Sequence, residues 1–319
     1  MQQSSILIMM PVYNDWVACS QLLQEIDTVA RAENWNASVL VIDDGSHSVG
    51  PNRALILSNL DQVEILRLRR NLGHQRAICI GLAHANDHWT GSCVIVMDGD
   101  GQDGPSDIPA LLKIALSDSQ APVVFAARQR RAESLLFRFF YVIFKTCHFL
   151  LTGHRVRVGN FSAIPSSRLK TLCVFPELWN HYAATVFKSK IPRTQIPIDR
   201  RTRSEGNSRM NFVGLVVHGL SAMSVFGETI GVRLLLVSGV LGLLAVLGGI
   251  IVTAIRLFTD WAIPGWATYA VLGMSIVGIQ AVLLMMVFVF VVLSARNASF
   301  FLPSRDYHSF VDRIEPWQS

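Results

Sequence analysis

The residues best suited to chemistry in this chain are Asp98 and Asp100, which stand directly after the apolar run 93–97. Such a run predicts a buried strand, and the acids then lie at its carboxyl end, where open α/β sheets bind ligands. Two carboxylates this close repel each other unless a cation lies between them. Oxygen ligands suit Mg²⁺ or Mn²⁺, which usually carries the phosphates of a substrate. The pattern predicts a metal-diphosphate site, with a solvated acidic turn as the alternative.

The elements that must position these acids alternate along the first 130 residues. Apolar runs predict strands, and apolar residues at helical spacing predict the helices between them. Strand followed by helix, repeated, predicts an α/β fold with a mostly parallel sheet and right-handed crossovers. Polar or acidic residues follow the strands, so the functional side chains are expected at one edge. The predicted strands are 5–10, 37–42, 63–68, 93–97 and 122–127, and the predicted helices are 16–31, one ending at Ala85, and 107–117.

Two long uncharged segments, 234–255 and 263–293, hold much of the apolar content of a chain in which 51% of residues are hydrophobic and the mean hydropathy is +0.38. Each segment exceeds the roughly 20 residues that a helix needs to cross a bilayer. Buried helices of a soluble protein are the alternative. Two such segments joined by a short loop nevertheless favour a transmembrane hairpin.

The charges around this hairpin predict its orientation. Basic residues flank the sides joined to the rest of the chain, whereas the loop between the two segments carries only Arg256 and Asp260. The positive-inside bias then places both termini in the cytoplasm. Residues 1–5 are polar and the apolar run after them is short, so no signal peptide is expected.

Two further segments, 135–151 and 210–232, are candidates for helices that lie on the membrane surface. The first is rich in Leu, Phe, Ile and Val with basic residues between them, which is typical of an interfacial helix. A core helix of the soluble domain has the same periodicity, so that alternative remains open.

Cysteine usage and charge exclude other classes of function. None of the five cysteines forms a CxxC pair, so neither a disulfide framework nor a zinc site is expected. The net charge is +5, and basic residues outnumber acids between positions 128 and 209. Because this basic stretch leads straight into the membrane segments, it suits anionic lipid or phosphate ligands and not nucleic acid.

Five motifs stand in order along the chain: Pro11-Val12-Tyr13-Asn14, Ile42-Asp43-Asp44-Gly45-Ser46, Asn71-x-Gly73, Asp98-x-Asp100-x-Gln102-Asp103 and Arg201-x-Arg203-x-x-Gly206-x-Ser208-Arg209. Together they resemble the motifs of the family 2 inverting glycosyltransferases. With the C-terminal hairpin added, the chain resembles the polyprenyl-phosphate glycosyltransferases, which include dolichol-phosphate mannose synthases and bacterial undecaprenyl-phosphate glucosyl and aminoarabinosyl transferases. The resemblance implies a GT-A fold, a nucleotide-sugar donor, a polyprenyl-phosphate acceptor and Mg²⁺ or Mn²⁺.

The resemblance also assigns residues to the donor. It implies that Asp98, Asp100 and Gln102 hold the metal, and that Asp103 faces the sugar or orients its neighbours. The residues at 43 and 44 alone favour a turn with a helix cap, an interpretation that the resemblance reverses. The residues implied to bind the nucleotide sugar are Pro11, Tyr13, Asn14, Asp43, Asp44, Asp98, Gly99, Asp100 and Ser208.

Four arginines are the candidates for phosphate contacts. Arg128 and Arg138 are implied to receive the acceptor phosphate, and Arg201 and Arg203 to belong to a loop that closes over both substrates. A guanidinium group suits this task because it binds phosphate through two parallel hydrogen bonds. Attraction to the membrane surface without substrate contact is the alternative for each. The candidate catalytic residues are Asp98, Asp100, Asp103, Arg128, Arg138, Arg201 and Arg203.

One position departs from the family pattern. The family often has Gly-Asp-Phe where this chain has Gly159-Asn160-Phe161. A missing carboxylate there is expected to alter a contact with the sugar or with the acceptor.

Sequence and resemblance together predict an inverting, metal-dependent enzyme that transfers a hexose from a nucleotide-diphosphate sugar to a polyprenyl phosphate, with undecaprenyl phosphate as the expected acceptor. The expected location is the bacterial inner membrane, with the reaction at its cytosolic face. A glycosyltransferase to another membrane lipid and a non-catalytic, membrane-anchored nucleotide-sugar binding protein are the alternatives. The choice between UDP and GDP stays open.

The expected organisation has four parts. A cytosolic GT-A domain, 1–209, precedes a juxtamembrane helix, 210–232; two transmembrane helices, 233–295, and a cytosolic tail, 296–319, follow. Hairpins of this kind often associate, which is compatible with a homo-oligomer.

Overall fold

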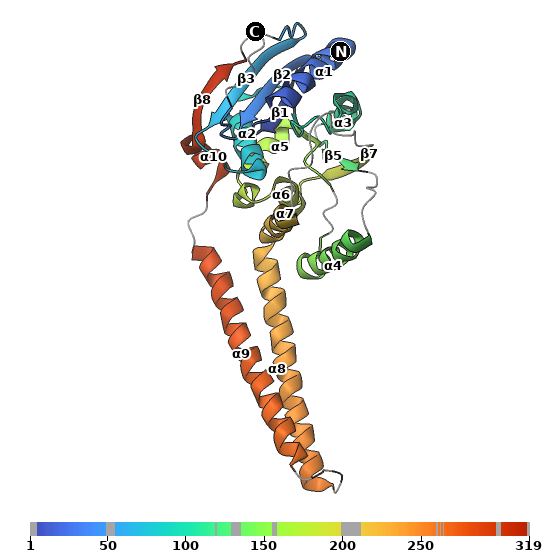
Figure 1. The fold of residues 1–319 in the computed structure, drawn as a ribbon, viewed down its shortest axis with the longest axis vertical. Helices are drawn as coiled ribbons and strands as arrows, with labels where there is room; N and C mark the ends of the chain where they lie inside the picture. Colours follow the sequence, from blue (N-terminus) through green and yellow to red (C-terminus); the bar gives the residue numbers. More distant parts are fainter. Residues whose placement is uncertain are drawn as a thin grey trace. The chain divides into compact units, whose positions relative to one another are not determined.

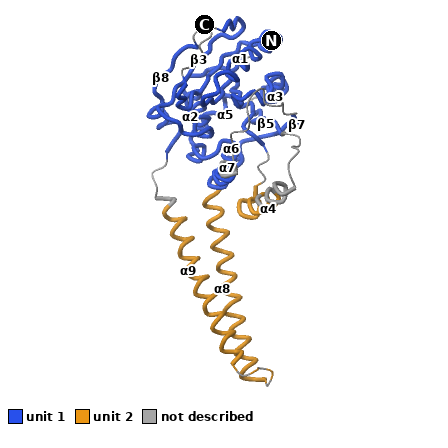
Figure 2. Tube along the Cα trace, in the orientation of Figure 1, with its two compact units in different colours: residues 1–138, 156–225, 300–319 blue, residues 139–155, 226–299 orange. Residues whose placement is uncertain are grey.

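The computed structural model describes residues 5–48, 55–118, 120–128, 135–154, 158–198, 212–259, 261, 263, 265–297 and 301–317. The chain divides into two compact units, which have different colours in Figure 2. Unit 1 comprises residues 1–138, 156–225 and 300–319, and unit 2 comprises residues 139–155 and 226–299. Each unit is therefore assembled from segments that are far apart in the sequence.

Unit 1 is built on a mixed sheet (Figure 1), whose strand order within the described residues is β7-β5-β6-β4-β1-β2-β3-β8. The central strands β4, β1, β2 and β3 are parallel, as the sequence predicts. The strands are β1 (Ser5–Val12), β2 (Asn36–Asp43), β3 (Leu60–Leu68), β4 (Cys93–Val96), β5 (Val123–Arg128), β6 (Ser162–Pro165), β7 (Arg193–Ile198) and β8 (Val311–Pro316).

The central strands are apolar at nearly every position because both faces of the sheet are covered. In β1, Ile6 and Ile8 pack against α1 and α3, whereas Leu7 and Met9 pack on the other face against α2, α5 and α6. The helices of unit 1 are α1 (Trp16–Glu33), α2 (His74–His88), α3 (Ile108–Ala115), α5 (Ser166–Cys173), α6 (Tyr182–Lys188), α7 (Phe212–Ser224) and α10 (Pro303–Asp306), with 3-10 turns η1 (Pro105–Asp107), η2 (Pro176–Trp179) and η3 (Tyr307–Phe310).

Two antiparallel strands interrupt the parallel pattern. Strand β6 lies between β4 and β5 and runs against both. Strand β8, the last of the chain, pairs antiparallel with β3 at one end of the sheet. The predicted mostly parallel α/β sheet is thus confirmed, and these two strands are additions that the sequence analysis did not anticipate.

Unit 2 contains the two membrane-length helices, α8 (Gly227–Phe258) and α9 (Trp266–Asn297). Both are long and apolar enough to cross a bilayer, and most of their side chains are exposed, unlike those of a soluble core helix. The structure divides the stretch 210–232 between α7 and the start of α8.

Helix α4 (Leu135–Thr152) begins in unit 1 and ends in unit 2. At its C-terminal end, Arg233 of α8 donates through Nη1 to the carbonyl oxygen of Leu150 at 2.6 Å. A guanidinium at this position satisfies a helix-end carbonyl and complements the negative end of the helix dipole. The interfacial role of 135–151 and the expected four-part organisation remain predictions.

The packing of α1 leads to a stability prediction. Ile26 is fully buried against the sheet, whereas Val17 on the same helix is 61% exposed. Ile26→Ala is expected to lower the free energy of unfolding of unit 1 by about 2–4 kcal/mol, because a cavity is left behind. Val17→Ala, the matched control, is expected to change it by less than about 0.5 kcal/mol. Denaturant unfolding of the full chain in detergent measures both, and equal effects would contradict the burial of α1.

Candidate active site

The parallel strands bring the predicted site residues to one edge of the sheet, here called the carboxyl edge: the C-terminal ends of β4, β1, β2 and β3 with the loops that follow them. The edge is held together by backbone hydrogen bonds between neighbouring loops. Met97 N donates to Met9 O at 3.1 Å, and Asp44 N donates to Val12 O at 2.9 Å. The loops that carry Asp98, Tyr13 and Asp44 therefore begin side by side.

Two glycines permit the close approach of these loops. A Cβ on Gly99 would lie 2.8 Å from Val12 Cγ2 and 2.9 Å from Pro11 O, so only glycine lets the acidic loop lie against the end of β1. Gly45 has a positive φ of 69°, and a Cβ there would lie 2.5 Å from the backbone of Arg70 and Asn71. Position 99 therefore requires glycine because of its close packing against Pro11, and its predicted contact with the nucleotide sugar stays a prediction.

The acidic loop, Asp98 to Asp103, is braced from within. Asp103 is buried, and its Oδ2 accepts the backbone N–H of Asp98 at 2.9 Å. Asp100 Oδ1 accepts the backbone N–H of Gln102 at 3.1 Å, which closes a tight turn. Of the two roles expected for Asp103, this contact corresponds to orienting its neighbours.

Two residues that the sequence analysis did not assign to the site contact Asp98. His74 Nε2 lies 3.1 Å from Asp98 Oδ1, and Asn160 Nδ2 donates to the same oxygen at 3.3 Å. Asn160 Nδ2 also lies 2.8 Å from His74 Nε2. Burial lowers the pKa of His74, but the charge and hydrogen bond of Asp98, followed by the charges of Asp100 and Asp44, together raise it above its ordinary value. The carboxylates around His74 therefore raise its affinity for a proton.

The side chain of Gln75 fixes the orientation of the Asn160 amide. Gln75 Nε2 donates to Asn160 Oδ1 at 3.0 Å, and Gln75 Oε1 accepts the backbone N–H of Tyr182 at 2.8 Å. With its oxygen occupied, the amide directs its NH₂ group toward Asp98. A carboxylate at this position could not donate in that way, so the departure from Gly-Asp-Phe has a direct structural consequence.

Asp43 and Asp44, at the end of β2, have different partners. Asp43 Oδ2 pairs with Arg67 Nη1 at 2.8 Å, and Asp43 Oδ1 accepts the backbone N–H of Ser46 at 2.9 Å. Asp44 accepts the backbone N–H of Leu72 at 2.7 Å and of Gly73 at 2.9 Å. Asp44 thereby holds the loop that starts α2 in place.

Burial raises the pKa of Asp44, although the two backbone hydrogen bonds and His74 oppose the rise. Asp43 and Asp44 are both buried, at 2% and 3% exposure, but their carboxylate oxygens have different hydrogen-bond partners. Both oxygens of each carboxylate are engaged, those of Asp44 by the loop backbone and those of Asp43 by Ser46 N and Arg67, so contact of either residue with the nucleotide sugar stays a prediction.

Asn14 links the first two loops of the carboxyl edge. Its backbone has a positive φ of 53°, and its Oδ1 accepts the backbone N–H groups of His47 at 2.9 Å and Ser48 at 3.3 Å. The backbone N–H of Asn14 in turn donates to Ser46 Oγ at 2.9 Å. The neighbouring Tyr13 is exposed at 38%, with its ring edge-on to His47, and is available for stacking.

The predicted basic residues are only partly described. The backbone places Arg128 at the carboxyl end of β5 and Arg138 in the first turn of α4. Arg201, Arg203 and Ser208 lie outside the described residues. The structure thus brings together the acidic and nucleotide-binding candidates, while the roles of the arginines stay predictions.

The oxygen atoms of the acidic loop suit a divalent cation that is also bound by phosphate oxygens and water. Within the part of the chain that the structure describes, no three His, Cys, Asp or Glu side chains are grouped to enclose a metal ion. Mg²⁺ is commonly held by one or two carboxylates together with phosphate oxygens and water, and not by a complete protein cage. Asp98, Asp100 and Gln102 offer the hard oxygen donors that such a site requires.

Comparisons with known proteins identify similar sequences and a similar fold. Residues 7–163 match the model of glycosyl transferase family 2. Two curated relatives, both described as undecaprenyl-phosphate 4-deoxy-4-formamido-L-arabinose transferase, come from Klebsiella pneumoniae strain 342 and Klebsiella pneumoniae subsp. pneumoniae strain ATCC 700721 / MGH 78578. They are 27% and 26% identical over 286 residues, which are 85% of this chain and 83% of each relative.

A solved structure has a similar fold. Glucosyl-3-phosphoglycerate synthase from Mycobacterium tuberculosis, solved in complex with Mn²⁺, uridine diphosphate and phosphoglyceric acid, aligns with a TM-score of 0.52 and 14% identity. The alignment covers 72% of this chain and 79% of that chain. The likeness confirms the fold class predicted for unit 1.

The contact between Asn160 and Asp98 leads to a prediction for metal binding. Asn160→Ala is expected to weaken Mn²⁺ binding by about tenfold, because partners that orient a ligating carboxylate typically matter by that much. Titration of Mn²⁺ by electron paramagnetic resonance, with and without UDP, measures the change. Asn59→Ala is the matched control, since Asn59 donates to Asp27 through its backbone N–H and through Nδ2, away from the carboxyl edge. Unchanged Mn²⁺ affinity in folded Asn160→Ala would refute the orienting role.

Proposed function

Because residues 7–163 of this glycosyltransferase form a family 2 domain, we propose that the chain transfers a sugar from a nucleotide-diphosphate sugar to a polyprenyl phosphate at the cytosolic face of a bacterial inner membrane. The observation that carries the proposal is the packing of the acidic loop against β1 through Gly99, which puts Asp98 and Asp43 at one edge. The two Klebsiella relatives, matched over 85% of this chain, support undecaprenyl phosphate as the acceptor.

The sugar is expected to be a hexose or an arabinose derivative. The sequence analysis favours a hexose, whereas the sugar in the names of the two relatives is a substituted arabinose, which is a pentose. A donor panel must therefore contain both classes, each linked to UDP and to GDP where such compounds exist.

The proposed reaction is a single displacement. An ionised oxygen of the acceptor phosphate attacks the anomeric carbon, a new C–O bond forms, and the bond to the diphosphate oxygen breaks with its electron pair staying on the nucleoside diphosphate. Because the phosphate is already ionised near neutral pH, no side chain has to remove a proton. One displacement inverts the anomeric configuration.

The side chains of the carboxyl edge then act by alignment and charge. Asp43, with Pro11, Tyr13 and Asn14 beside it, binds the nucleoside, and Asp44 holds the loop behind it. Asp98, Asp100 and Gln102 would hold Mg²⁺ or Mn²⁺, which would supply positive charge for the departing diphosphate. Asp103 and Asn160 keep the acidic loop in position. Proximity and preorganised charge are the sources of catalysis in this scheme.

The basic residues receive the phosphates in the same scheme. Arg128 and Arg138 bind the acceptor phosphate, and Arg201, Arg203 and Ser208 contribute donors from a loop over both substrates. Guanidinium groups match phosphate oxygens through paired hydrogen bonds, so they also favour the ionised acceptor that the reaction needs.

The connectivity of the chain supports the proposed membrane topology. The chain leaves unit 1 to enter α8, and after α9 it returns to unit 1, where β8 pairs with β3. A bilayer crossed by α8 is therefore crossed again by α9, and both ends of the hairpin emerge on the side of the catalytic domain. With the positive-inside bias, that side is the cytoplasm.

The test uses purified full-length protein in detergent with undecaprenyl phosphate, Mg²⁺ or Mn²⁺, and radiolabelled UDP- and GDP-sugars. Labelled lipid-phosphate sugar with inverted configuration supports the proposal. Labelling of a glycerolipid in place of undecaprenyl phosphate would replace the acceptor, and nucleotide-sugar binding without transfer to any lipid would make the chain a binding protein.

The acidic loop generates the first functional prediction. Asp100→Ala is expected to reduce lipid labelling by on the order of 100-fold or more, because charge on the leaving diphosphate is no longer neutralised. Asp118→Ala is a matched control: Asp118 makes the same type of turn, accepting Gln120 N at 2.7 Å, outside the carboxyl edge. Labelling by folded Asp100→Ala at the rate of Asp118→Ala would remove the metal assignment.

A second functional prediction concerns Arg138 of α4. Arg138→Ala is expected to raise the KM for undecaprenyl phosphate by about tenfold, the equivalent of one charge-assisted hydrogen bond, with a smaller effect on the KM for the donor. Lys145→Ala, on the same helix, tests general attraction to the membrane. If both variants lose acceptor use equally, Arg138 acts only through the surface charge of the helix.

A further inference from the structure

The C-terminal strand β8 closes the edge of the sheet next to the candidate nucleoside site. It runs antiparallel to β3, with Arg67 opposite Arg313 and Leu66 opposite Ile314. Beyond its two ends, Arg69 N donates to Phe310 O at 2.9 Å, and Trp317 N donates to Val63 O at 2.8 Å. The strand that follows the membrane hairpin is therefore an integral part of unit 1.

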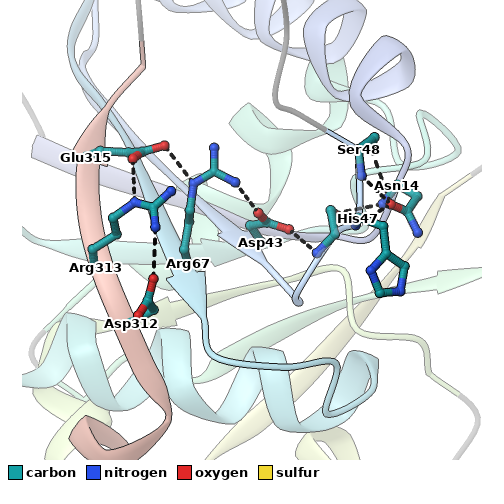
Figure 3. A network of polar contacts seen from close by, with 9 residues as sticks. Asn14, Asp43, His47, Ser48, Arg67, Asp312, Arg313 and Glu315 are labelled. Carbon is teal, nitrogen blue, oxygen red and sulfur yellow. Dashed lines mark hydrogen bonds and ion pairs between the residues drawn. The ribbon is translucent and has the colours of Figure 1, made fainter.

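Strand β8 also supplies a side chain that is connected to Asp43 (Figure 3). Glu315 Oε1 accepts a hydrogen bond from Arg67 Nε at 2.6 Å, and Arg67 Nη1 donates to Asp43 Oδ2 at 2.8 Å. Arg67 is thus held at two of its nitrogens by carboxylates from different strands. Its side chain is 18% exposed and that of Asp43 is 3% exposed, so solvent screens this pairing only weakly.

The position of Glu315 is itself constrained. Arg313, on the same strand, donates through Nε to Glu315 Oε2 at 2.9 Å, so both carboxylate oxygens are engaged. Arg67 lies over the ring of Trp16 at 5.9 Å, and Trp16 in turn packs against Trp317 at a ring-centroid distance of 6.1 Å. Glu315 of β8 contacts the Arg67 guanidinium directly, and Trp317, just after β8, packs against the Trp16 ring beneath it.

We propose that the C-terminal strand is a positioning element of the nucleoside site, in which Glu315 orients Arg67 and Arg67 orients Asp43. The inference rests on the proposed function, because it takes Asp43 to be the carboxylate that contacts the nucleoside. Glu315 touches no substrate in this scheme. Its effect is to fix the direction of the Asp43 oxygens, since Ser46 N holds one of them and Arg67 holds the other.

A positioning role for Glu315 and a general stabilising role predict different effects on nucleotide binding. An edge strand held only by backbone pairing and by Trp317 would keep the sheet intact without Glu315, and donor binding would be unaffected. A positioning role predicts a specific loss of nucleotide affinity in a protein that remains folded. Point variants are needed, because removal of the whole strand would also expose β3 and Trp16.

The experiment compares Glu315→Ala, Glu315→Gln and Asp312→Asn in the full-length protein in detergent. Asp312 is the matched control on the same strand: it pairs with Arg313 at 2.9 Å and Arg69 at 3.6 Å, and it is linked to Arg67 only indirectly, through Arg313 and Glu315. Binding of UDP and of GDP is titrated calorimetrically in the presence of Mn²⁺, and the KM for the donor and kcat are measured with undecaprenyl phosphate.

Glu315→Ala is expected to weaken nucleotide binding and to raise the donor KM by about fivefold, with kcat and the melting temperature nearly unchanged. Glu315→Gln, which retains an acceptor for Arg67, is expected to recover part of the loss, and Asp312→Asn to match the wild type. Equal nucleotide affinity in Glu315→Ala and wild type, or a fall in kcat and melting temperature with no change in KM, would overturn the inference.

The two proposals fail separately. If nucleotide binding depends on Glu315 but no sugar reaches undecaprenyl phosphate, the proposed transfer is wrong and the positioning role stands. If transfer occurs and Glu315→Ala leaves the donor KM unchanged, the positioning role alone is wrong. If the wild type binds neither UDP nor GDP, both proposals are rejected.

Discussion

Acidic side chains at the ends of β2 and β4 are withdrawn from bulk water, and a carboxylate in that position is stable only where donors replace the lost solvent. Asp44 receives two backbone N–H groups, Asp43 receives Arg67, and Asp98 receives His74 and Asn160. Removing Arg67 would leave the buried Asp43 carboxylate without its charged partner, which costs several kcal/mol. The arrangement of unit 1 around the carboxyl edge follows from that requirement.

This requirement couples elements that do not follow one another in the chain. By accepting Leu72 N and Gly73 N, Asp44 fixes the first turn of α2, which begins at His74. The same turn carries Gln75, which orients Asn160 toward Asp98. An acid at the end of β2 thus determines where a donor stands beside the acid at the end of β4, although the two acids make no direct contact among the described interactions.

Much of this could be predicted from the sequence because it depends on local patterns. The parallel strands are continuous apolar runs, and each acid or glycine of the site follows such a run directly. Strand β6 is only four residues long and pairs with β4 across 60 or more positions, and no local pattern signals that pairing. His74 was visible only as a polar residue after the glycine that starts a helix. Arg67 and Glu315 are 248 positions apart, and their pairing required the structure.

The late arrival of β8 has a consequence for biosynthesis. Until β8 leaves the ribosome, β3 presents an unpaired edge, and such edges invite association with other chains. At translation rates of about 5–20 residues per second, the interval between Arg67 and Glu315 lasts roughly 12–50 s, during which both hydrophobic helices, α8 and α9, are also synthesised. The charged side chains of Glu64, Arg67 and Arg69 along β3 and its end make that nascent edge a poor partner for aggregation. Pairing of β8 with β3 therefore takes place only after α8 and α9 have been synthesised.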